Sequence, residues 1–162
     1  MKTYFIADTH FDDENILRYE NRPFESVHEM NQTILKKWNE KVGVDDAVYI
    51  IGDIGNARYV KMLNGRKYLI KGNHDTFDND YYRQVGFEEV YDLPVIFNSF
   101  WMLSHEPLYI NNNMPYANIF GHVHANPNYC SASSHGVCVS VERTGYAPLE
   151  LSEIKEMIEN CR

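Results

Sequence analysis

Five short apolar segments of the sequence each run into an acidic, amide or histidine side chain, and this repeated pattern constrains the fold more than any other feature. The segments cover residues 3–7, 47–51, 67–70, 100–103 and 117–120. Apolar runs of this length, bounded by polar turn residues, are typical of buried strands. In layered α/β folds the carboxyl ends of such strands share one rim of the sheet, where ligand sites gather. We therefore expect the polar side chains that follow the segments to lie close together.

A histidine-rich set of metal donors follows these segments. It contains no cysteine and consists of Asp8, His10, Asp53, Asn73, His105, His122 and His124. Such a set suits Mn, Fe or Zn better than Ca or Mg. The donors are too many for one ion, and because a carboxylate can bridge, they fit two divalent cations about 3.5 to 4 Å apart. Manganese is the first choice, with iron, zinc or nickel as alternatives. Gly72 and Gly121 lie beside these donors, where the absence of a Cβ lets the backbone turn tightly.

Two helices and one more strand are predicted elsewhere. Residues Ser26–Glu29 have the form of a capping box, and apolar residues recur at helical spacing from Val27 to Trp38. Residues 137–141 are predicted to form a strand, and Ser152 is predicted to cap a last helix. The buried face of that helix would carry Ile154, Met157 and Ile158.

The composition narrows the class of protein. The chain has 162 residues, with 15 basic and 23 acidic side chains, so its formal net charge is −8. An acidic balance argues against a protein that mainly grips nucleic acid or an anionic membrane. The three cysteines have no paired spacing, which favours reduced thiols in the cytoplasm, and no apolar stretch is long enough for a membrane span. Residues 1–162 are expected to form a single domain.

The order of the motifs resembles the calcineurin-like metallophosphoesterase family, whose blocks run Asp-x-His, Gly-Asp, Gly-Asn-His-Asp, a lone His and Gly-His-x-His. The corresponding blocks here are Asp8–His10, Gly52-Asp53, Gly72–Asp75, His105 and Gly121–His124. Gly-Asn-His-Asp together with Gly-His-x-His is far more specific than one motif alone. The resemblance implies an α/β fold of two packed mixed sheets flanked by helices, a four-layer α/β/β/α sandwich.

The resemblance also implies a role for each motif residue. One metal would be held by Asp8, His10, Asp53 and His124. The other would be held by Asp53, Asn73, His105 and His122, with Asp53 as the bridge. His74 would be the catalytic histidine, held by Asp75.

The N-terminal segment resembles a small bacterial and phage branch of this family. The resemblance lies in Asp8–Phe11, Glu14–Ile16 and Asn21–Phe24. The branch commonly has Gly-His where this chain has Asp12-Asp13, a difference that could alter substrate access. The Ser/Thr protein phosphatases have a phosphate-gripping Asp-Arg pair where this chain has Asn56-Ala57, with Arg58 one place later. This departure argues against protein phosphatase activity.

The sequence thus predicts a dinuclear-metal-dependent phosphoesterase. Two cations lower the pKa of a shared water toward about 7, so that a metal-bound hydroxide would attack phosphorus directly. The substrate is expected to be a small, nucleotide-like phosphodiester or phosphomonoester. The chain has no room for a large cap domain, so an open site is expected, which would permit diesters or oligonucleotide ends. Arg58, Tyr109 and Tyr116 are candidate substrate contacts, through phosphate or through stacking on a base.

Two alternatives remain open at this point. A nuclease acting on DNA or RNA could use the same site, although the acidic balance and the absence of a basic stripe count against it. A non-catalytic interaction scaffold of the same fold would be expected to have lost ligands, whereas every ligand position is present. No membrane partner is expected, and the sequence does not fix the oligomeric state.

Overall fold

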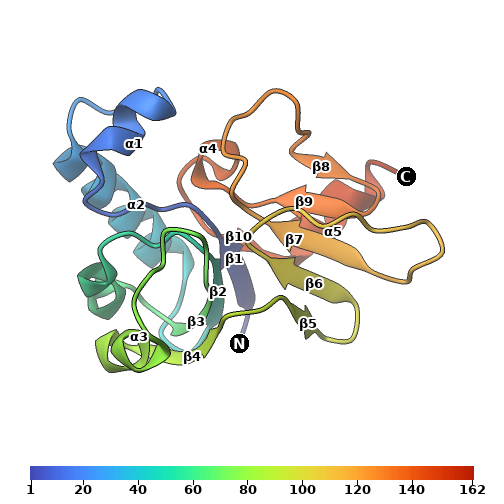
Figure 1. The fold of residues 1–162 in the computed structure, drawn as a ribbon, viewed down its shortest axis with the longest axis horizontal. Coiled ribbons are helices and arrows are strands. Elements are labelled where there is room, and N and C mark those ends of the chain that lie inside the picture. The colour runs from blue at the N-terminus through green and yellow to red at the C-terminus, as the bar shows by residue number, and fades with distance from the viewer.

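The computed structural model describes residues 1–162 and contains two five-stranded mixed sheets (Figure 1). The first sheet has the strand order β10-β1-β2-β3-β4. Its strands are β1 (Thr3–Ile6), β2 (Ala47–Ile51), β3 (Arg66–Ile70), β4 (Phe87–Tyr91) and β10 (Leu149–Glu150). Strands β1 to β4 are parallel, and β10 adds an antiparallel edge.

The second sheet has the strand order β5-β6-β7-β9-β8. Its strands are β5 (Val95–Phe97), β6 (Trp101–Ser104), β7 (Ala117–Phe120), β8 (Ala132–Ser133) and β9 (Gly136–Cys138). The three central strands β6, β7 and β9 are parallel, and both edge strands are antiparallel. The two mixed sheets that the sequence predicts are therefore confirmed.

The two sheets are joined at the carboxyl ends of their parallel strands. Ala7, just beyond β1, forms a parallel bridge with Ser140, just beyond β9. The Ala7 N–H donates to the Val139 carbonyl at 2.9 Å, and the Val141 N–H donates to the Ala7 carbonyl at 3.1 Å. Because parallel strands end on the same edge, this junction brings the ends of β1, β2 and β3 toward those of β6 and β7.

One hydrophobic core lies between the sheets and a second lies under the helices of the first sheet. The core between the sheets combines Phe5, Ile51 and Ile70 of the first sheet with Leu103, Ile119 and Val137 of the second. The other core joins the opposite face of the first sheet, through Tyr4, Val48 and Leu69, to α2. Burial on both faces explains why the predicted strands are continuous apolar runs.

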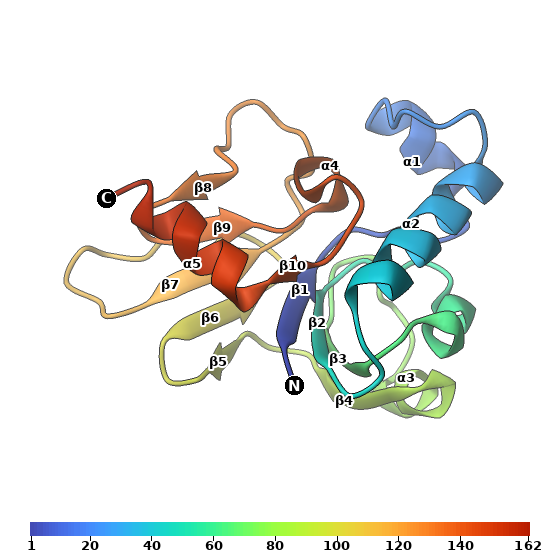
Figure 2. The same cartoon turned by 180° about the vertical axis from the view of Figure 1, so that it is seen from behind.

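Five α-helices flank the sheets (Figure 2). They are α1 (Glu14–Tyr19), α2 (Val27–Lys41), α3 (Asn79–Val85), α4 (Val141–Thr144) and α5 (Leu151–Glu159), and a 3₁₀ helix covers Ala57–Met62. Helix α5 lies against β1, β8, β9 and β10, and its Ile154 and Ile158 enter the core between the sheets.

Helix α2 begins where the sequence predicts, with one difference at its cap. The Ser26 hydroxyl accepts the Glu29 N–H at 3.1 Å, and Met30, Ile34 and Trp38 are buried on one face. The Glu29 carboxylate accepts the backbone N–H of Glu25 rather than that of Ser26. The predicted capping box is therefore only half formed, because the chain enters the helix from a turn that presents another N–H.

The cap predicted for the last helix is wrong by two residues. Glu150 is the N-cap of α5, and Glu153 completes a reciprocal capping box with it. Ser152 lies inside the helix and is exposed, while Met157 is half-buried. A carboxylate near a helix N-terminus satisfies free backbone N–H groups as a serine hydroxyl does.

The predicted strand at residues 137–141 is too long. Strand β9 ends at Cys138, and Val141 is already the first residue of α4. The apolar run continues past the strand end because Val139 and Val141 are buried on both sides of Ser140. Periodicity alone does not separate such a turn from a strand.

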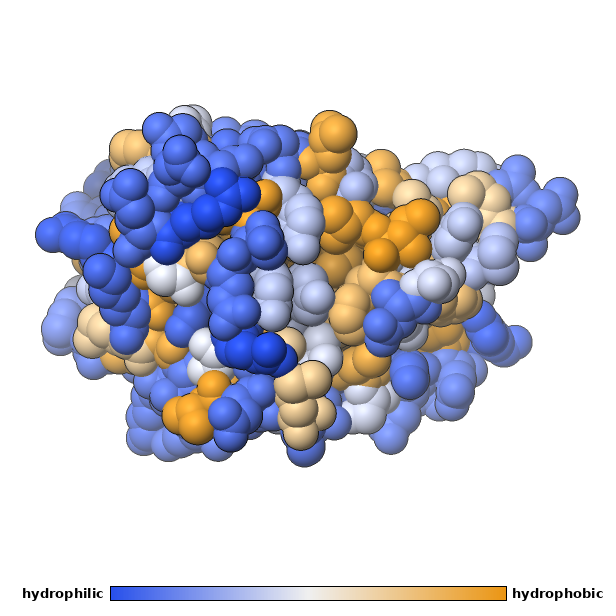
Figure 3. Space-filling model, turned by 90° about the horizontal axis from the view of Figure 1, so that it is seen from below, coloured by the Kyte–Doolittle hydropathy of each residue, from blue (hydrophilic) through white to orange (hydrophobic).

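Seen from below, hydrophobic residues gather on the side of the second sheet (Figure 3). Leu93, before β5, and Ile96, within β5, are both exposed. No helix in the structure combines the length and the apolar character needed to cross a bilayer.

Replacing Ile34 with alanine tests the core under α2. Ile34 is fully buried between the helix and the first sheet. We expect Ile34→Ala to lower the free energy of unfolding by about 2 to 5 kcal/mol through lost burial and a residual cavity. Lys36→Ala on the exposed side of the same helix should change it by less than about 0.5 kcal/mol. Urea denaturation measures both values, and equal effects would contradict this packing.

Candidate metal centre

The structure brings the seven predicted donors together at the junction of the sheets. Asp8 follows β1, Asp53 follows β2 and Asn73 follows β3, all on one edge of the first sheet. His105 follows β6, and the Gly121–His124 turn follows β7. The donors fall into two groups that share Asp53.

One of the two groups, called the second donor group, consists of Asp53, Asn73, His105 and His122. Its donor atoms lie at short distances from one another. His105 Nε2 lies 3.2 Å from His122 Nδ1 and 3.3 Å from Asp53 Oδ2. Asn73 Oδ1 lies 3.1 Å from the same two imidazole nitrogens. Ligands bonded to one ion at about 2.0 to 2.2 Å lie about 3.0 to 3.5 Å from one another, so these four donors could hold one cation.

The first donor group consists of Asp8, His10, Asp53 and His124. His10 Nε2 lies 3.6 Å from Asp53 Oδ2, and His124 Nε2 lies 3.9 Å from Asp8 Oδ1. Asp8 Oδ1 and His10 Nε2 are both buried without any hydrogen-bond partner. Buried polar atoms are nearly always satisfied, so orphaned atoms that face one another call for an ion or water between them.

The other atoms of these donors are held by protein groups. Asp8 Oδ2 accepts the Ser140 hydroxyl at 2.6 Å and the His122 N–H at 2.9 Å. His105 Nδ1 bonds the Ile51 carbonyl at 2.9 Å. A proton on that nitrogen leaves the Nε2 lone pair free toward the second donor group. The two donor groups share Asp53, and each offers atoms that could hold a divalent cation.

The backbone of the site is strained. Asp8, His10, Asp53, His122 and His124 all have positive φ angles, between 47° and 67°. Non-glycine residues rarely adopt this region, and such strain clusters at functional sites. Cross-loop hydrogen bonds hold it, since Asp8 N–H donates to the Gly52 carbonyl and His10 N–H to the Asp53 carbonyl, each at 3.0 Å.

The two predicted glycines are needed for close approach rather than for a special backbone angle. A Cβ on Gly121 would lie 2.5 Å from the Ala7 Cβ and 2.7 Å from Asp8 Oδ2. A Cβ on Gly72 would collide with the Asp53 carboxylate. Neither glycine has a positive φ. A larger side chain at either position would therefore displace a donor carboxylate.

Burial shifts the pKa of most donors. It raises the pKa of Asp8 to about 6, against the opposing effect of His124 and His105. It lowers the pKa of His10 to about 4. For His105 the effect of burial is outweighed by the hydrogen bond and charge of Asp53, which raise its pKa to about 9, and the pKa of Asp53 is lowered in return. Without a cation, a proton on His105 thus balances the Asp53 carboxylate.

The structure does not bear out the expected support of His74 by Asp75. The Asp75 carboxylate accepts the backbone N–H groups of Gly72, Asp53 and Ile54, at 2.9, 2.7 and 3.1 Å. Both of its oxygens are occupied, so it joins the loops after β2 and β3 instead of holding the His74 ring. The His74 N–H donates to Asp53 Oδ1 at 2.9 Å, and its exposed imidazole lies with its centroid 5.3 Å from that of His10.

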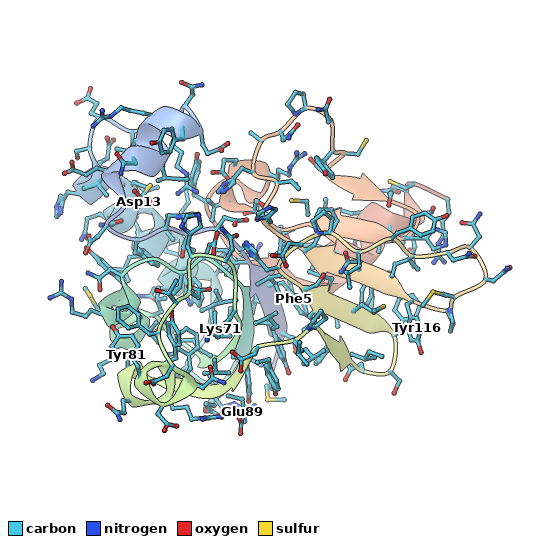
Figure 4. The ribbon with its side chains drawn as sticks, viewed as in Figure 1. Phe5, Asp13, Lys71, Tyr81, Glu89 and Tyr116 are labelled. Atoms are coloured by element: carbon cyan, nitrogen blue, oxygen red, sulfur yellow. The ribbon has the colours of Figure 1, made fainter.

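The three candidate substrate contacts lie outside the two donor groups. Arg58 is exposed, and its Nε donates to Asn56 Oδ1. Tyr109 follows His105 by four positions and is 88% exposed. Tyr116 precedes β7, so the strand separates it from His122, and Figure 4 shows it far from the centre of the molecule, which is marked by Phe5.

Sequence reasoning missed a group of residues around α4 that contact the donors. Ser140 donates to Asp8, the Glu142 carboxylate lies 3.0 Å from His124 Nδ1, and Arg143 Nε donates to the His124 carbonyl. These residues follow the last motif, at the end of the strand predicted over residues 137–141, and belong to none of the motifs that supply the donors. Only the short spacing of polar side chains after an apolar run distinguishes them.

Comparison with known proteins identifies the family. A family model described as calcineurin-like phosphoesterase matches residues 1–135. The chain belongs to this family. The family is metal-dependent, in keeping with the donor groups at the sheet junction.

Relatives of the chain occur in an archaeon and a phage. An uncharacterized protein of Methanocaldococcus jannaschii is 36% identical over 173 residues, which cover 98% of this chain and 92% of that protein. The gene 66 protein of Mycobacterium phage L5 is 32% identical over 96 residues, which cover 52% of this chain and 46% of that protein. The phage protein is consistent with the branch that the N-terminal motifs resemble.

Two solved structures share the fold. A protein of unknown function from Aquifex aeolicus has a TM-score of 0.76 and 26% identity, over 97% of this chain and 99% of that one. The nuclease MPE of Pseudomonas putida has a TM-score of 0.51 and 21% identity, over 75% of this chain and 61% of that one. These similarities support the same arrangement of two sheets.

Replacing Asp8 with asparagine tests the burial of charge in the metal-free protein. A raised pKa means that the carboxyl group favours folding below its ordinary pKa of 3.8 and loses that contribution as the pH rises through about 6. At pH 7 the buried charge should cost of order 2 to 3 kcal/mol, at about 1.4 kcal/mol per pKa unit. We expect metal-free Asp8→Asn to be more stable than the original protein at pH 7, with the gain gone near pH 4.

Asp46→Asn provides a control of opposite sign. The backbone N–H groups of Lys2 and Gly43 lower the pKa of Asp46, so this substitution should reduce stability at pH 7. Guanidinium denaturation in the presence of a chelator measures both variants. A loss of stability in Asp8→Asn at pH 7 would show that its buried charge is compensated by the protein alone.

Proposed function

We propose that this chain is a phosphoesterase that uses two divalent cations to hydrolyse a small phosphodiester or phosphomonoester. The observation that carries the proposal is the pair of donor groups sharing Asp53, with Asp8 Oδ1 and His10 Nε2 buried and unpartnered. Membership of the calcineurin-like phosphoesterases supports it. The first donor group would hold one cation and the second donor group the other, with manganese as the first choice.

The chemistry that bound cations supply is activation of water near neutral pH and neutralisation of phosphate oxygens. The protein supplies the remaining parts. Asp8 and Asp53 place two negative charges in the interior, where both side chains are almost fully buried. The exposed side chains of Asn73, His74 and His122 line the side from which a substrate can approach. An open approach admits phosphodiesters as well as phosphomonoesters.

His74 is proposed to stabilise or protonate the leaving oxygen of the substrate. The backbone N–H of His74 donates to Asp53 Oδ1, which keeps His74 beside the carboxylate that the two donor groups share. The His74 ring is exposed and makes no hydrogen bond to the protein. Asp75 would act as a positioning residue, because it fixes the loops that present Asp53 and His74. Arg58 and Tyr109 remain candidate substrate contacts, and a cytoplasmic setting remains a prediction.

The proposal is tested by hydrolysis of a chromogenic phosphodiester and the matching phosphomonoester. The Mn²⁺-loaded protein should turn over at least one of them, and a chelator should abolish the activity because the nucleophile depends on the cations. A panel of nucleotides, cyclic nucleotides and a short DNA oligonucleotide would then define the substrate. Turnover confined to the oligonucleotide would favour the nuclease alternative, and no turnover of any substrate would contradict the proposal.

The His74→Ala variant separates catalysis from metal binding. It keeps the backbone N–H that holds Asp53, so cation binding should be unchanged while the rate falls by about 10² to 10⁴. His28→Ala is the matched control, since His28 is exposed on α2. Unchanged turnover in His74→Ala would exclude the proposed acid role.

A further inference from the structure

A buried ion pair lies beside the first donor group, outside the motifs that supply the metal donors. Arg22 Nη2 lies 2.7 Å and Arg22 Nε 2.9 Å from Glu142 Oε1, and the two side chains are 0% and 5% exposed. Removing two charges from water is costly, and apolar replacements of buried pairs are often neutral or stabilising. Stability alone therefore gives no reason for this pair, and its other contacts become informative.

Glu142 reaches a predicted metal donor. Its Oε1 accepts from His124 Nδ1 at 3.0 Å as well as from Arg22. A proton held on Nδ1 leaves the lone pair on Nε2. That nitrogen faces Asp8 Oδ1 across 3.9 Å. The carboxylate of Glu142 thus selects both the tautomer and the orientation that His124 needs in order to bind a cation.

Arg22 reaches the backbone of the other donors. Its Nη2 donates to the Asp8 carbonyl at 2.6 Å, and its Nη1 donates to the Thr9 carbonyl at 3.0 Å. These carbonyls belong to the turn in which Asp8 and His10 have positive φ. One guanidinium therefore ties the strained turn after β1 to α4, which carries Glu142.

The second donor group is supported differently. The Nδ1 of His105 bonds a main-chain carbonyl, that of Ile51, at the end of β2. No charged side chain takes part in that contact. His124 of the first donor group is thus oriented by a charged side chain, whereas His105 of the second is oriented by a main-chain carbonyl of β2.

We infer that Arg22 and Glu142 are positioning residues that orient His124 and the Asp8–His10 turn for the cation held by the first donor group. This inference rests on the proposed function. It also gives a role to the Asn21–Phe24 motif. Phe24 packs edge-to-face on Tyr146 at 4.8 Å, and the Tyr146 ring lies 5.9 Å from the Arg22 guanidinium.

The test is a titration of the metal-free protein with Mn²⁺ alone, followed by the electron paramagnetic resonance signal of the free ion. The unaltered protein should bind two ions. Outer contacts of metal ligands typically contribute about 10- to 100-fold in affinity. We expect Glu142→Ala to weaken one ion by about this factor and to leave the other within about threefold. Glu142→Gln keeps an acceptor for His124, so its affinity for that ion should lie between those of the unaltered protein and Glu142→Ala.

Two further variants separate positioning from folding. Glu142→Ala leaves the Arg22 charge buried and unpaired, which could unfold the protein. The double variant Arg22→Met with Glu142→Ala removes both charges and should fold, while still losing affinity at one ion only. Glu153→Gln, which alters the half-buried pair with Lys41 far from the donors, should bind both ions normally. Normal affinity at both ions in the double variant, or equal loss at both, would overturn the inference.

A second readout does not depend on cations. Long-range ¹H–¹⁵N spectra of the metal-free protein identify which nitrogen of the neutral His124 ring carries the proton. We expect Nδ1 in the unaltered protein and a mixture of tautomers in the double variant. If the unaltered protein bound no cation, the proposed function would fail, and this spectrum would still decide the role of Glu142. A mixture in the unaltered protein would refute that role.

Discussion

The burial of two carboxylates, Asp8 and Asp53, is the constraint on which the rest of the structure depends. Their side chains are 0% and 2% exposed, at the junction where the two sheets meet. An ionised carboxylate in such a place needs opposite charge or several donors. Asp53 is paired with His105. Asp8 Oδ2 accepts hydrogen bonds from the Ser140 hydroxyl and the His122 N–H, but Asp8 Oδ1 has no hydrogen-bond partner. A cation would neutralise the negative charge on Asp8 that the protein leaves uncompensated.

The fold concentrates these groups by topology. Parallel strands in both sheets end on the same edge, and the bridge between Ala7 and Ser140 joins the two edges. The donors themselves sit in strained turns, and Gly72 and Gly121 lie too close to the donor carboxylates to carry a side chain. Such a site is held by the surrounding sheets rather than by its own local preferences. This arrangement agrees with the general observation that strain is tolerated where function requires it.

Much of this arrangement could be predicted from the sequence because it depends on local patterns. Buried strands are apolar runs, and the residues that follow them lie on one edge of the sheet. The sequence therefore predicts that the seven donors lie close together. Strand β4 was not, because it lies at a sheet edge, with Glu88 and Glu89 exposed and an irregular register against β3. Periodicity weakens where one face of a strand is open and the pairing is interrupted.

The contacts that no local pattern encodes could not be predicted. Asp75 braces backbone N–H groups rather than His74, although its spacing in the motif is the expected one. Arg22 and Glu142 are 120 residues apart and meet only because α4 returns to the end of β1. Tyr116 and His122 are close in sequence, yet β7 separates them. Long-range pairing decides which polar residues meet, and a single sequence does not contain it.

The formal net charge of the chain is −8, and two of its negative charges, those of Asp8 and Asp53, are proposed to bind cations. The most direct test of that account is the electron paramagnetic resonance spectrum of the protein loaded with two equivalents of Mn²⁺. Two ions that share the Asp53 carboxylate, about 3.5 to 4 Å apart, should be exchange-coupled and give a multiline spectrum. A spectrum of isolated Mn²⁺ ions, or of ions left free in solution, would contradict the shared two-cation centre.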